Sequence, residues 1–255
     1  PALFWASSTF LPVALPLFAT VLTASLLATL SHVREHARAT RVAGMLARFV
    51  SPALLRELDA RGSARRFPAA QRADLTVLFV DIAGFTPFTE EQEPEETSQF
   101  LDVFYQVAME ELFRHKGTLD EFKGDGVLAY FGAPEALPEK ETLAVKAAAA
   151  IRDRVALLNA ERRARGKAEL GIRCGLTTGF VAVGYFGGES HATYGVVGRA
   201  VNLAARLQAH AESGQILVDK PTAARLDATI GKTELEPITL KGIAKPVEVW
   251  RVAEA

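Results

Sequence analysis

The apolar run LTVLFV at residues 75–80 places the strongest constraint on what this chain can fold into. A short run of apolar and β-branched residues is typical of a buried strand. Asp81 follows the run directly, so a carboxylate stands at the end of that strand. A loop containing Gly84, Thr86 and Pro87 comes next.

The segments after this strand alternate in a regular order. An apolar stripe at helical spacing begins near Pro94 and stops at Gly117, a hairpin is predicted at 118–122 and 127–131, and a second helix runs from Leu137 to about Arg165. Strands follow near 170–177, 180–185 and 192–197, then a helix at 200–211, a strand at 215–218, a short helix at 221–228 and a closing pair at 234–240 and 246–252. The central order β-α-β-β-α-β is the ferredoxin-like plan. We therefore predict an α+β fold with a ferredoxin-like βαββαβ core and extra C-terminal strands.

The N-terminal stretch is apolar and uncharged. No Asp, Glu, Lys or Arg occurs from Pro1 to Val33, and residues 10–30 have the length of a membrane span. Basic residues follow at Arg34, Arg38, Arg41 and Arg48, which marks the cytoplasmic side. A buried core helix and a signal peptide are the alternatives, and the second lacks its charged n-region.

This pattern predicts three parts. Residues 1–31 are expected to form a transmembrane helix. Because the chain starts on Pro and not on Met, this helix is expected to be the end of a longer membrane or sensor region. Residues 32–72 are expected to form a helical linker, either a passive spacer or a coupling helix that pairs with its twin in a dimer. Residues 73–255 would form a globular domain on the cytoplasmic side of the inner cell membrane.

Charge and cysteine content exclude some functions. The net charge is -1, from 29 basic and 30 acidic residues, so no general basic field for nucleic acid exists. Cys174 is the only cysteine and cannot form an intrachain disulfide. The five histidines make no spaced zinc set with it.

Two aspartates are candidate metal ligands. Asp81 ends the buried strand, and Asp125 stands at the tip of the predicted hairpin in the sequence KGDG. Each alone fits an ordinary loop or turn residue. If the hairpin pairs beside the strand, the two carboxylates come together as a Mg²⁺ or Mn²⁺ site open to phosphate oxygens.

A third element lies on the predicted helix at 200–211. Asn202 and Arg206 are four residues apart and share one helix face. An amide beside a guanidinium suits recognition of ribose and phosphate. An exposed polar face would also explain Arg206.

In this order, the segments FVDIAGFT, FKGDGVLAYFG, GLTTGFVAVGYFGG and VVGRAVNLAARL resemble class III nucleotide cyclases, the adenylate and guanylate cyclase family. The resemblance covers Asp74 to about Val252. It implies an intracellular signalling enzyme that cyclises a nucleoside triphosphate and releases pyrophosphate. It also implies a head-to-tail homodimer with two composite active sites, because one chain carries both halves.

The resemblance implies specific residue roles. Asp81, the backbone of Ile82 and Asp125 would hold two divalent ions, Mg²⁺ or Mn²⁺. Asn202 would orient the ribose, and Arg206 would stabilise charge in the transition state. The triphosphate would be bound by the loop residues Gly84, Phe85 and Thr86 and by a C-terminal lysine, either Lys241 or Lys245.

The base-reading positions of the family correspond to Glu121 and Gly195. A carboxylate accepts hydrogen bonds from guanine N1–H and its amine, whereas it would repel the N1 acceptor of adenine. We therefore favour GTP as substrate and cyclic GMP as product. Two alternatives stay open: an adenylate cyclase that makes cyclic AMP, with Lys123 reading adenine from a shifted register, and an inactive cyclase-homology domain that serves as a dimeric regulatory module.

Overall fold

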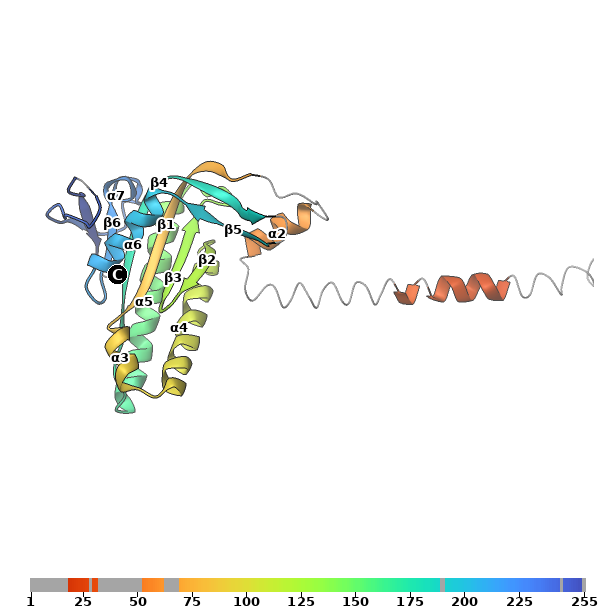
Figure 1. Ribbon diagram of the computed structural model, residues 1–255, viewed down its shortest axis with the longest axis horizontal. Helices are drawn as coiled ribbons and strands as arrows, with labels where there is room; N and C mark the ends of the chain where they lie inside the picture. Colours follow the sequence, from red (N-terminus) through yellow and green to blue (C-terminus); the bar gives the residue numbers. More distant parts are fainter. Residues whose placement is uncertain are drawn as a thin grey trace, which may run out of the picture. The chain divides into compact units, whose positions relative to one another are not determined.

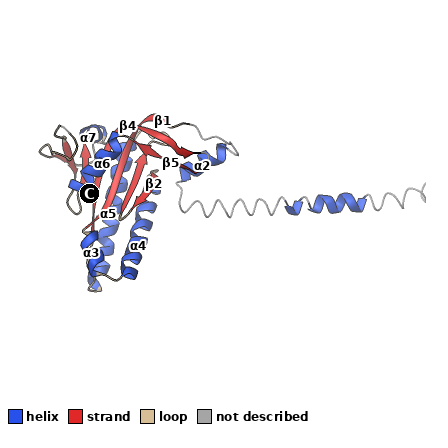
Figure 2. Cartoon of the chain, in the orientation of Figure 1, coloured by secondary structure: helices blue, strands red, loops and turns tan. Residues whose placement is uncertain are grey.

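The computed structural model describes residues 18–27, 29–31, 52–61, 69–188, 191–243 and 245–253. The chain divides into two compact units, Pro1–Phe49 and Val50–Ala255. The second unit contains the mixed sheet and the helices around it (Figures 1 and 2).

The described residues of the first unit do not form the membrane helix that the sequence predicts. Residues 18–27 and 29–31 are helical, and residues 1–17, 28 and 32–49 lie outside the described part. A bilayer crossing needs about 20 apolar helical residues. No helix in the described part of the chain combines that length with sufficient apolar character. This finding contradicts the predicted inner-membrane location, and the described residues do not show the predicted membrane contact.

Only part of the expected linker is described. Helix α2 (Pro52–Arg61) begins at Pro52, as the sequence predicts, because proline is compatible with the first helical turn. Its Leu54 is buried, and its Arg56 forms an exposed ion pair with Glu135, with 3.1 Å between N and O. Residues 32–51 and 62–68 lie outside the described residues.

The second unit is built on an eight-stranded sheet of order β2-β3-β1-β4-β6-β8-β7, with β5 paired to β4. Its strands are β1 (Gln71–Ala83), β2 (Thr118–Lys123), β3 (Gly126–Phe131), β4 (Gly171–Gly188), β5 (His191–Val197), β6 (Ile216–Asp219), β7 (Lys232–Glu234) and β8 (Val249–Val252). Its later helices are α3 (Phe85–Glu91), α4 (Pro94–Arg114), α5 (Lys140–Ala164), α6 (Arg199–His210) and α7 (Lys220–Arg225). The order β1-α4-β2-β3-α5-β4 matches the predicted βαββαβ core.

Strand β1 is central and buried on both faces. Successive side chains of a strand point to opposite faces. Leu78, Val80 and Ile82 therefore join the core under α4 and α5, whereas Val77 and Phe79 join the core under α6. Helices α4 and α5 lie side by side over one face (Figure 1). The run at 75–80 is fully buried because helices cover both sides of it.

Several local elements differ from the sequence prediction. The closing strands predicted at 234–240 and 246–252 are shorter in the structure, at Lys232–Glu234 and Val249–Val252. The loop expected after Asp81 contains the short helix α3, because Gly84 adopts a left-handed φ of 77° just before it and Pro87 falls in its first turn, where proline is tolerated. The strands expected at 170–177 and 180–185 form one strand, β4. Its Gly179 does not break the strand, because it is paired with Leu75 of the long β1.

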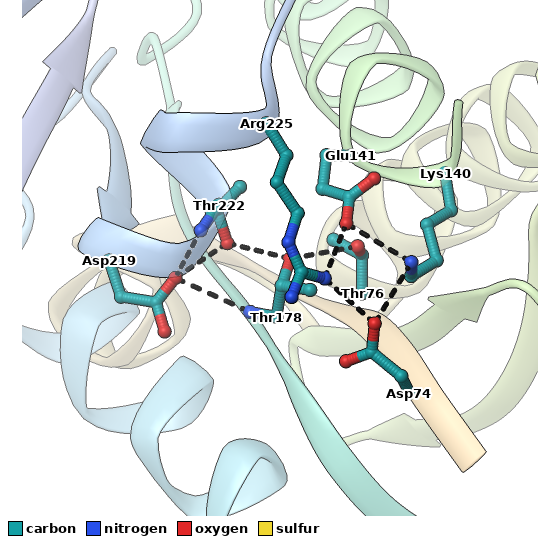
Figure 3. A network of polar contacts seen from close by, with 8 residues as sticks. All are labelled: Asp74, Thr76, Lys140, Glu141, Thr178, Asp219, Thr222 and Arg225. Atoms are coloured by element: carbon teal, nitrogen blue, oxygen red, sulfur yellow. Dashed lines mark hydrogen bonds and ion pairs between the residues drawn. The ribbon is translucent and has the colours of Figure 1, made fainter. Parts of the chain in front are cut away.

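A partly buried polar network joins α5 and α7 to the start of β1 (Figure 3). Arg225 of α7 contacts Asp74 at 2.7 Å and the 3%-exposed Glu141 at 3.2 Å. Lys140 contacts the same two carboxylates at 3.2 and 3.1 Å. Burial opposes ionisation of Asp74, but Arg225 and Lys140 outweigh it and lower its pKa. The network therefore fixes the helices to the sheet.

The same network continues through hydroxyl groups to Asp219. Thr76 contacts Thr178 at 2.9 Å, and Thr178 contacts Thr222 at 2.9 Å, in each case between hydroxyl oxygens. Asp219 caps α7 by accepting hydrogen bonds from the backbone N–H and hydroxyl of Thr222, at 3.0 and 2.6 Å. Burial raises the pKa of Asp219 to about 6, against the effect of these donors.

Candidate active site

The β1–β3 ladder brings Asp81 and Asp125 together. Asp81 is paired with Gly126, and Asp125 directly precedes Gly126 at the hairpin tip. Burial and then the negative charge of Asp81 raise the pKa of Asp125, and the nearby Arg173 offsets part of the effect. Two carboxylates side by side, with Asp125 partly buried, form a site that attracts a cation.

The hairpin tip is held by α4. The hydroxyl of Tyr105 donates a hydrogen bond to the carbonyl of Gly124. The Tyr105 ring also packs on Phe122, with 4.3 Å between ring centroids. Sequence reasoning assigned no role to Tyr105, because its contact with the hairpin depends on how α4 lies against β2.

The two carboxylate oxygens of Asp81 face different neighbours. Oδ2 accepts hydrogen bonds from Nη2 and Nε of Arg173, at 2.7 and 3.1 Å, and from Nε2 of Gln208, at 2.9 Å. Oδ1 lies toward β3, where a Cβ placed on Gly126 would be 3.2 Å away. Oδ2 is therefore held by two side chains, while Oδ1 lies on the side of Asp125.

Arg173 and Gln208 were not predicted from the sequence. Arg173 is opposite Asp81 in the β1–β4 ladder, which becomes visible only when the register is known. In the sequence Gln208 only follows the apolar Leu207, and the structure shows that its side chain is 6% exposed. A buried amide needs a partner.

The segment after Asp81 presents backbone groups. Ile82 is buried in the core, so only its backbone can face the site. Gly84 and Thr86 are exposed at the start of α3, and the Phe85 side chain packs against the core. The carbonyl of Gly84 accepts a hydrogen bond from the N–H of Phe88 at 3.2 Å. This arrangement is compatible with the predicted phosphate-binding loop.

Asn202 and Arg206 lie in a different place from the two aspartates. They line a cavity between α6 and the C-terminal segment, together with Arg199, Leu203, Gly242 and Ile243. The Arg206 guanidinium packs so closely on Gly242 that a Cβ there would be 3.2 Å from Nη2. Lys241 adjoins this cavity in sequence, and Lys245 lines a neighbouring groove. Neither Asp81 nor Asp125 lines this cavity or the neighbouring groove.

The predicted base-reading residues also have a neighbour that the sequence did not reveal. Glu121 follows a bulge in β2 and is half exposed, with its carboxylate 3.7 Å from Nζ of Lys123. Asp120, not Glu121, reaches Gly195: its Oδ1 accepts the N–H of Val196 at 3.0 Å and would be 2.6 Å from a Cβ on Gly195. Burial raises the pKa of Asp120 to about 6.

The residues around Asp81 fit a hard divalent cation. Among the residues that the structure describes, no group of three or more His, Cys, Asp or Glu side chains could enclose a metal ion. Two carboxylates with an open side are what Mg²⁺ and Mn²⁺ sites use when substrate phosphates complete the ligand set. The donor set is therefore consistent with an ion that binds together with a triphosphate.

Comparison with known sequences identifies relatives of this domain. Residues 67–253 match the family described as the adenylate and guanylate cyclase catalytic domain. Adenylate cyclase 1 of Rhizobium meliloti is 35% identical over 140 residues, which is 55% of this chain and 21% of that protein. An uncharacterized protein of Mycobacterium tuberculosis is 32% identical over 231 residues, which is 87% of this chain and 38% of that protein. The chain thus spans well under half the length of these relatives.

Solved structures show the same fold. The adenylyl cyclase CyaB from P. aeruginosa superimposes with a TM-score of 0.71 at 34% identity, covering 74% of this chain and 97% of that one. The guanylyl cyclase Cya2 superimposes with a TM-score of 0.67 at 32% identity, covering 73% of this chain and 94% of that one.

Proposed function

The chain belongs to the family of adenylate and guanylate cyclase catalytic domains, and from this premise we propose that it converts GTP to 3′,5′-cyclic GMP and pyrophosphate. The 3′-oxygen of the ribose attacks the α-phosphorus, the bond from that phosphorus to the pyrophosphate oxygen breaks, and the hydroxyl proton passes to solvent. The observation that carries the proposal is the adjacency of Asp81 and Asp125 across the β1–β3 ladder.

Asp81, Asp125 and the backbone carbonyl of Ile82 would hold two Mg²⁺ or Mn²⁺ ions. Bound there, such ions favour deprotonation of the 3′-hydroxyl and neutralise charge on the triphosphate. The side chains themselves supply the anionic oxygens and fix where they point. The backbone N–H groups of Gly84, Phe85 and Thr86 would bind phosphate oxygens, and the exposure of Gly84 and Thr86 supports this role.

The second group of residues acts on the sugar and the reacting phosphorus. The amide of Asn202 would orient the ribose, and the guanidinium of Arg206 would stabilise the charge that develops at the α-phosphorus. Lys241 and Lys245 are the two candidates for a lysine that binds the triphosphate. The cavity beside Arg206 supports Lys241, because Lys241 directly precedes Gly242 in its lining.

The separation of the two groups supports a dimer. Asp81 and Asp125 lie outside the cavity that contains Asn202 and Arg206. A head-to-tail homodimer would place the aspartates of one protomer beside the Asn202 and Arg206 of its partner. Each dimer would then have two composite sites, and one protomer alone would have none.

The choice of GTP rests on Glu121. Its carboxylate is half exposed on β2, so it is accessible to a base, and it can accept hydrogen bonds from guanine N1–H and the exocyclic amine. Adenine offers an acceptor at N1 instead. Asp120 adds a second carboxylate beside Gly195.

ATP is the second candidate, because Adenylate cyclase 1 and CyaB are among the similar proteins and Lys123 lies next to Glu121. An inactive regulatory module is less well supported, since Asp81, Asp125, Asn202 and Arg206 are all retained.

A product assay separates these possibilities. The purified 255-residue chain is incubated with GTP or with ATP, each with Mn²⁺ or Mg²⁺, and the products are separated by chromatography. We expect cyclic GMP as the main product. Predominant cyclic AMP would favour ATP, and no cyclic product from either nucleotide in a folded dimer would favour the regulatory module.

A further inference from the structure

Gln208 connects α6 to the metal-binding aspartate. Its side chain is only 6% exposed, and its Nε2 donates to Oδ2 of Asp81 at 2.9 Å. This contact links the helix that carries Asn202 and Arg206 to the strand that carries Asp81.

Gly175 allows α6 to come close enough for this contact. A Cβ on Gly175 of β4 would lie 2.3 Å from the carbonyl oxygen of Ala204 and 2.3 Å from the backbone nitrogen of Gln208. Any larger residue would push this part of α6 off the sheet. The close packing therefore holds the backbone of Gln208 at a fixed distance from Asp81.

The two functional faces of α6 point in different directions. Residues of an α-helix are separated by about 100° around the axis, so Gln208 lies on nearly the opposite side of α6 from Arg206. Arg206 and Asn202 share a face, while Gln208 faces β1 and β4. One face of α6 thus carries Asn202 and Arg206, and the opposite face contacts Asp81 through Gln208.

Arg173 and Gln208 bind the same oxygen but differ in charge. A divalent cation on Asp81 repels the guanidinium of Arg173 and competes with it for the carboxylate. The neutral amide of Gln208 keeps its hydrogen bond without that repulsion. Gln208 is therefore the donor that can hold Oδ2 when a cation is bound at Oδ1.

We propose that Gln208 is a positioning residue that holds Oδ2 of Asp81 so that Oδ1 faces Asp125 and the divalent cations. The proposal rests on the proposed function for the identity of the cation site. Partners that orient metal ligands in this way typically contribute about 10- to 100-fold to metal affinity.

Direct Mn²⁺ binding tests the proposal. The loss of the free Mn²⁺ electron paramagnetic resonance signal is measured on titration of the wild-type chain and of Gln208→Met, which keeps the volume and removes the donor. The Asp81→Ala variant measures the Mn²⁺ binding that does not depend on Asp81. Gln106→Met is the matched control, because Gln106 is an exposed glutamine on α4. We expect the Asp81-dependent Kd for Mn²⁺ to rise about tenfold in Gln208→Met and to stay within twofold in Gln106→Met. An unchanged Kd in folded Gln208→Met overturns the proposal, as does a wild-type chain without Asp81-dependent binding.

A one-site heterodimer separates positioning of Asp81 from general packing of α6. An Asp81→Ala protomer paired with an Arg206→Ala protomer has one intact composite site, which uses Asp81 of the second protomer and Arg206 of the first. Gln208→Met is placed in either protomer, and turnover is measured. We expect at least a fivefold larger loss when it shares a chain with the intact Asp81. Equal losses mean that Gln208 acts through α6 packing, which contradicts the proposal.

The two experiments distinguish failure of this inference from failure of the proposed function. A chain that binds Mn²⁺ through Asp81 but forms no cyclic nucleotide overturns the cyclase proposal and leaves the role of Gln208 supported if its variant weakens binding. A chain that forms cyclic nucleotide supports the cyclase proposal, and an unchanged Mn²⁺ affinity in its Gln208→Met variant overturns the role of Gln208.

Discussion

Asp81 and Arg173 face each other across the β1–β4 ladder, and the Arg173 guanidinium donates two hydrogen bonds to a single oxygen of Asp81, at 2.7 and 3.1 Å. The pair is partly buried, with 32% of the Arg173 side chain and 14% of the Asp81 side chain exposed. The pair therefore offsets the negative charge of Asp81 in the folded chain, while the other oxygen lies on the side of Asp125.

Removal of Arg173 should therefore affect both stability and activity. In Arg173→Met, Asp81 loses two charge-assisted hydrogen bonds, and the free energy of unfolding should fall by about 1–3 kcal/mol. The measurement is urea denaturation followed by circular dichroism. Arg163→Met is the matched control, because its pair with Glu169 is more exposed and is expected to contribute less than about 1 kcal/mol. A similar loss in both variants would argue against a special role for the Asp81–Arg173 pair.

The close approach of α6 to β4 predicts a steric effect at Gly175. In Gly175→Ala the new Cβ meets backbone atoms of α6 that cannot rotate away, so we expect a loss of about 1–3 kcal/mol in stability. Gly179→Ala on the same strand is the control, because its Cβ would meet only the Cβ of Ala200, at 3.8 Å. Thermal unfolding of the two variants checks this, and equal midpoints would contradict the packing described for α6.

The raised pKa of Asp219 should make the stability of the protein depend on pH. Burial raises its pKa in the folded protein to about 6, above the usual 3.8 of an aspartate. The folded state therefore binds this proton more tightly than the unfolded state, and the contribution of Asp219 to the free energy of unfolding falls as pH rises from about 4 to about 6. The difference over this window is about 3 kcal/mol.

The substitution Asp219→Asn isolates this effect, because an amide oxygen can keep the contacts with Thr222 without titrating. The stability of the wild-type chain relative to Asp219→Asn, measured by urea denaturation at several pH values, should decline between about pH 4 and pH 6. A constant difference across that window would show that Asp219 does not titrate as its burial implies.

Substitution of Glu121 is expected to change the nucleotide preference. In Glu121→Lys, an ammonium donor replaces the acceptor that we assign to guanine, so the ratio of cyclic AMP to cyclic GMP should rise at least about tenfold. The control is Glu234→Lys, an exposed glutamate on β7. An unchanged ratio would remove Glu121 from base recognition. A combined Gly195→Asp substitution is a poorer test, because any Cβ there meets the carboxylate of Asp120 at 2.6 Å.

The sequence was sufficient for the parts of the site that depend on local pattern. A buried run followed by Asp81, and a glycine-flanked Asp125 at a hairpin, predicted two strands and two carboxylates that the β1–β3 register brings together. The helical spacing of Asn202 and Arg206 likewise predicted a shared face, and both residues line one cavity.

The residues that were missed depend on contacts between distant elements. Gln208 reaches Asp81 only because Gly175 lets α6 pack closely on β4, and Arg173 is identified only by its register with β1. The bulge between Leu119 and Glu121 determines which β2 carboxylate meets Gly195, and this shift has no clear sequence signal. The N-terminal prediction rested on hydropathy and length alone, and no helix in the described part of the chain is long and apolar enough to span a membrane.

The central claim is that catalysis requires Asp81 from one protomer and Arg206 from the other. The most direct measurement is complementation: Asp81→Ala and Arg206→Ala chains, each inactive alone, are refolded together in equal amounts and assayed with GTP and Mn²⁺. Half of the dimers would be mixed and each would have one intact site, so about a quarter of wild-type activity should return. No recovery from chains that fold and form mixed dimers, or substantial activity in either variant alone, would contradict the composite site.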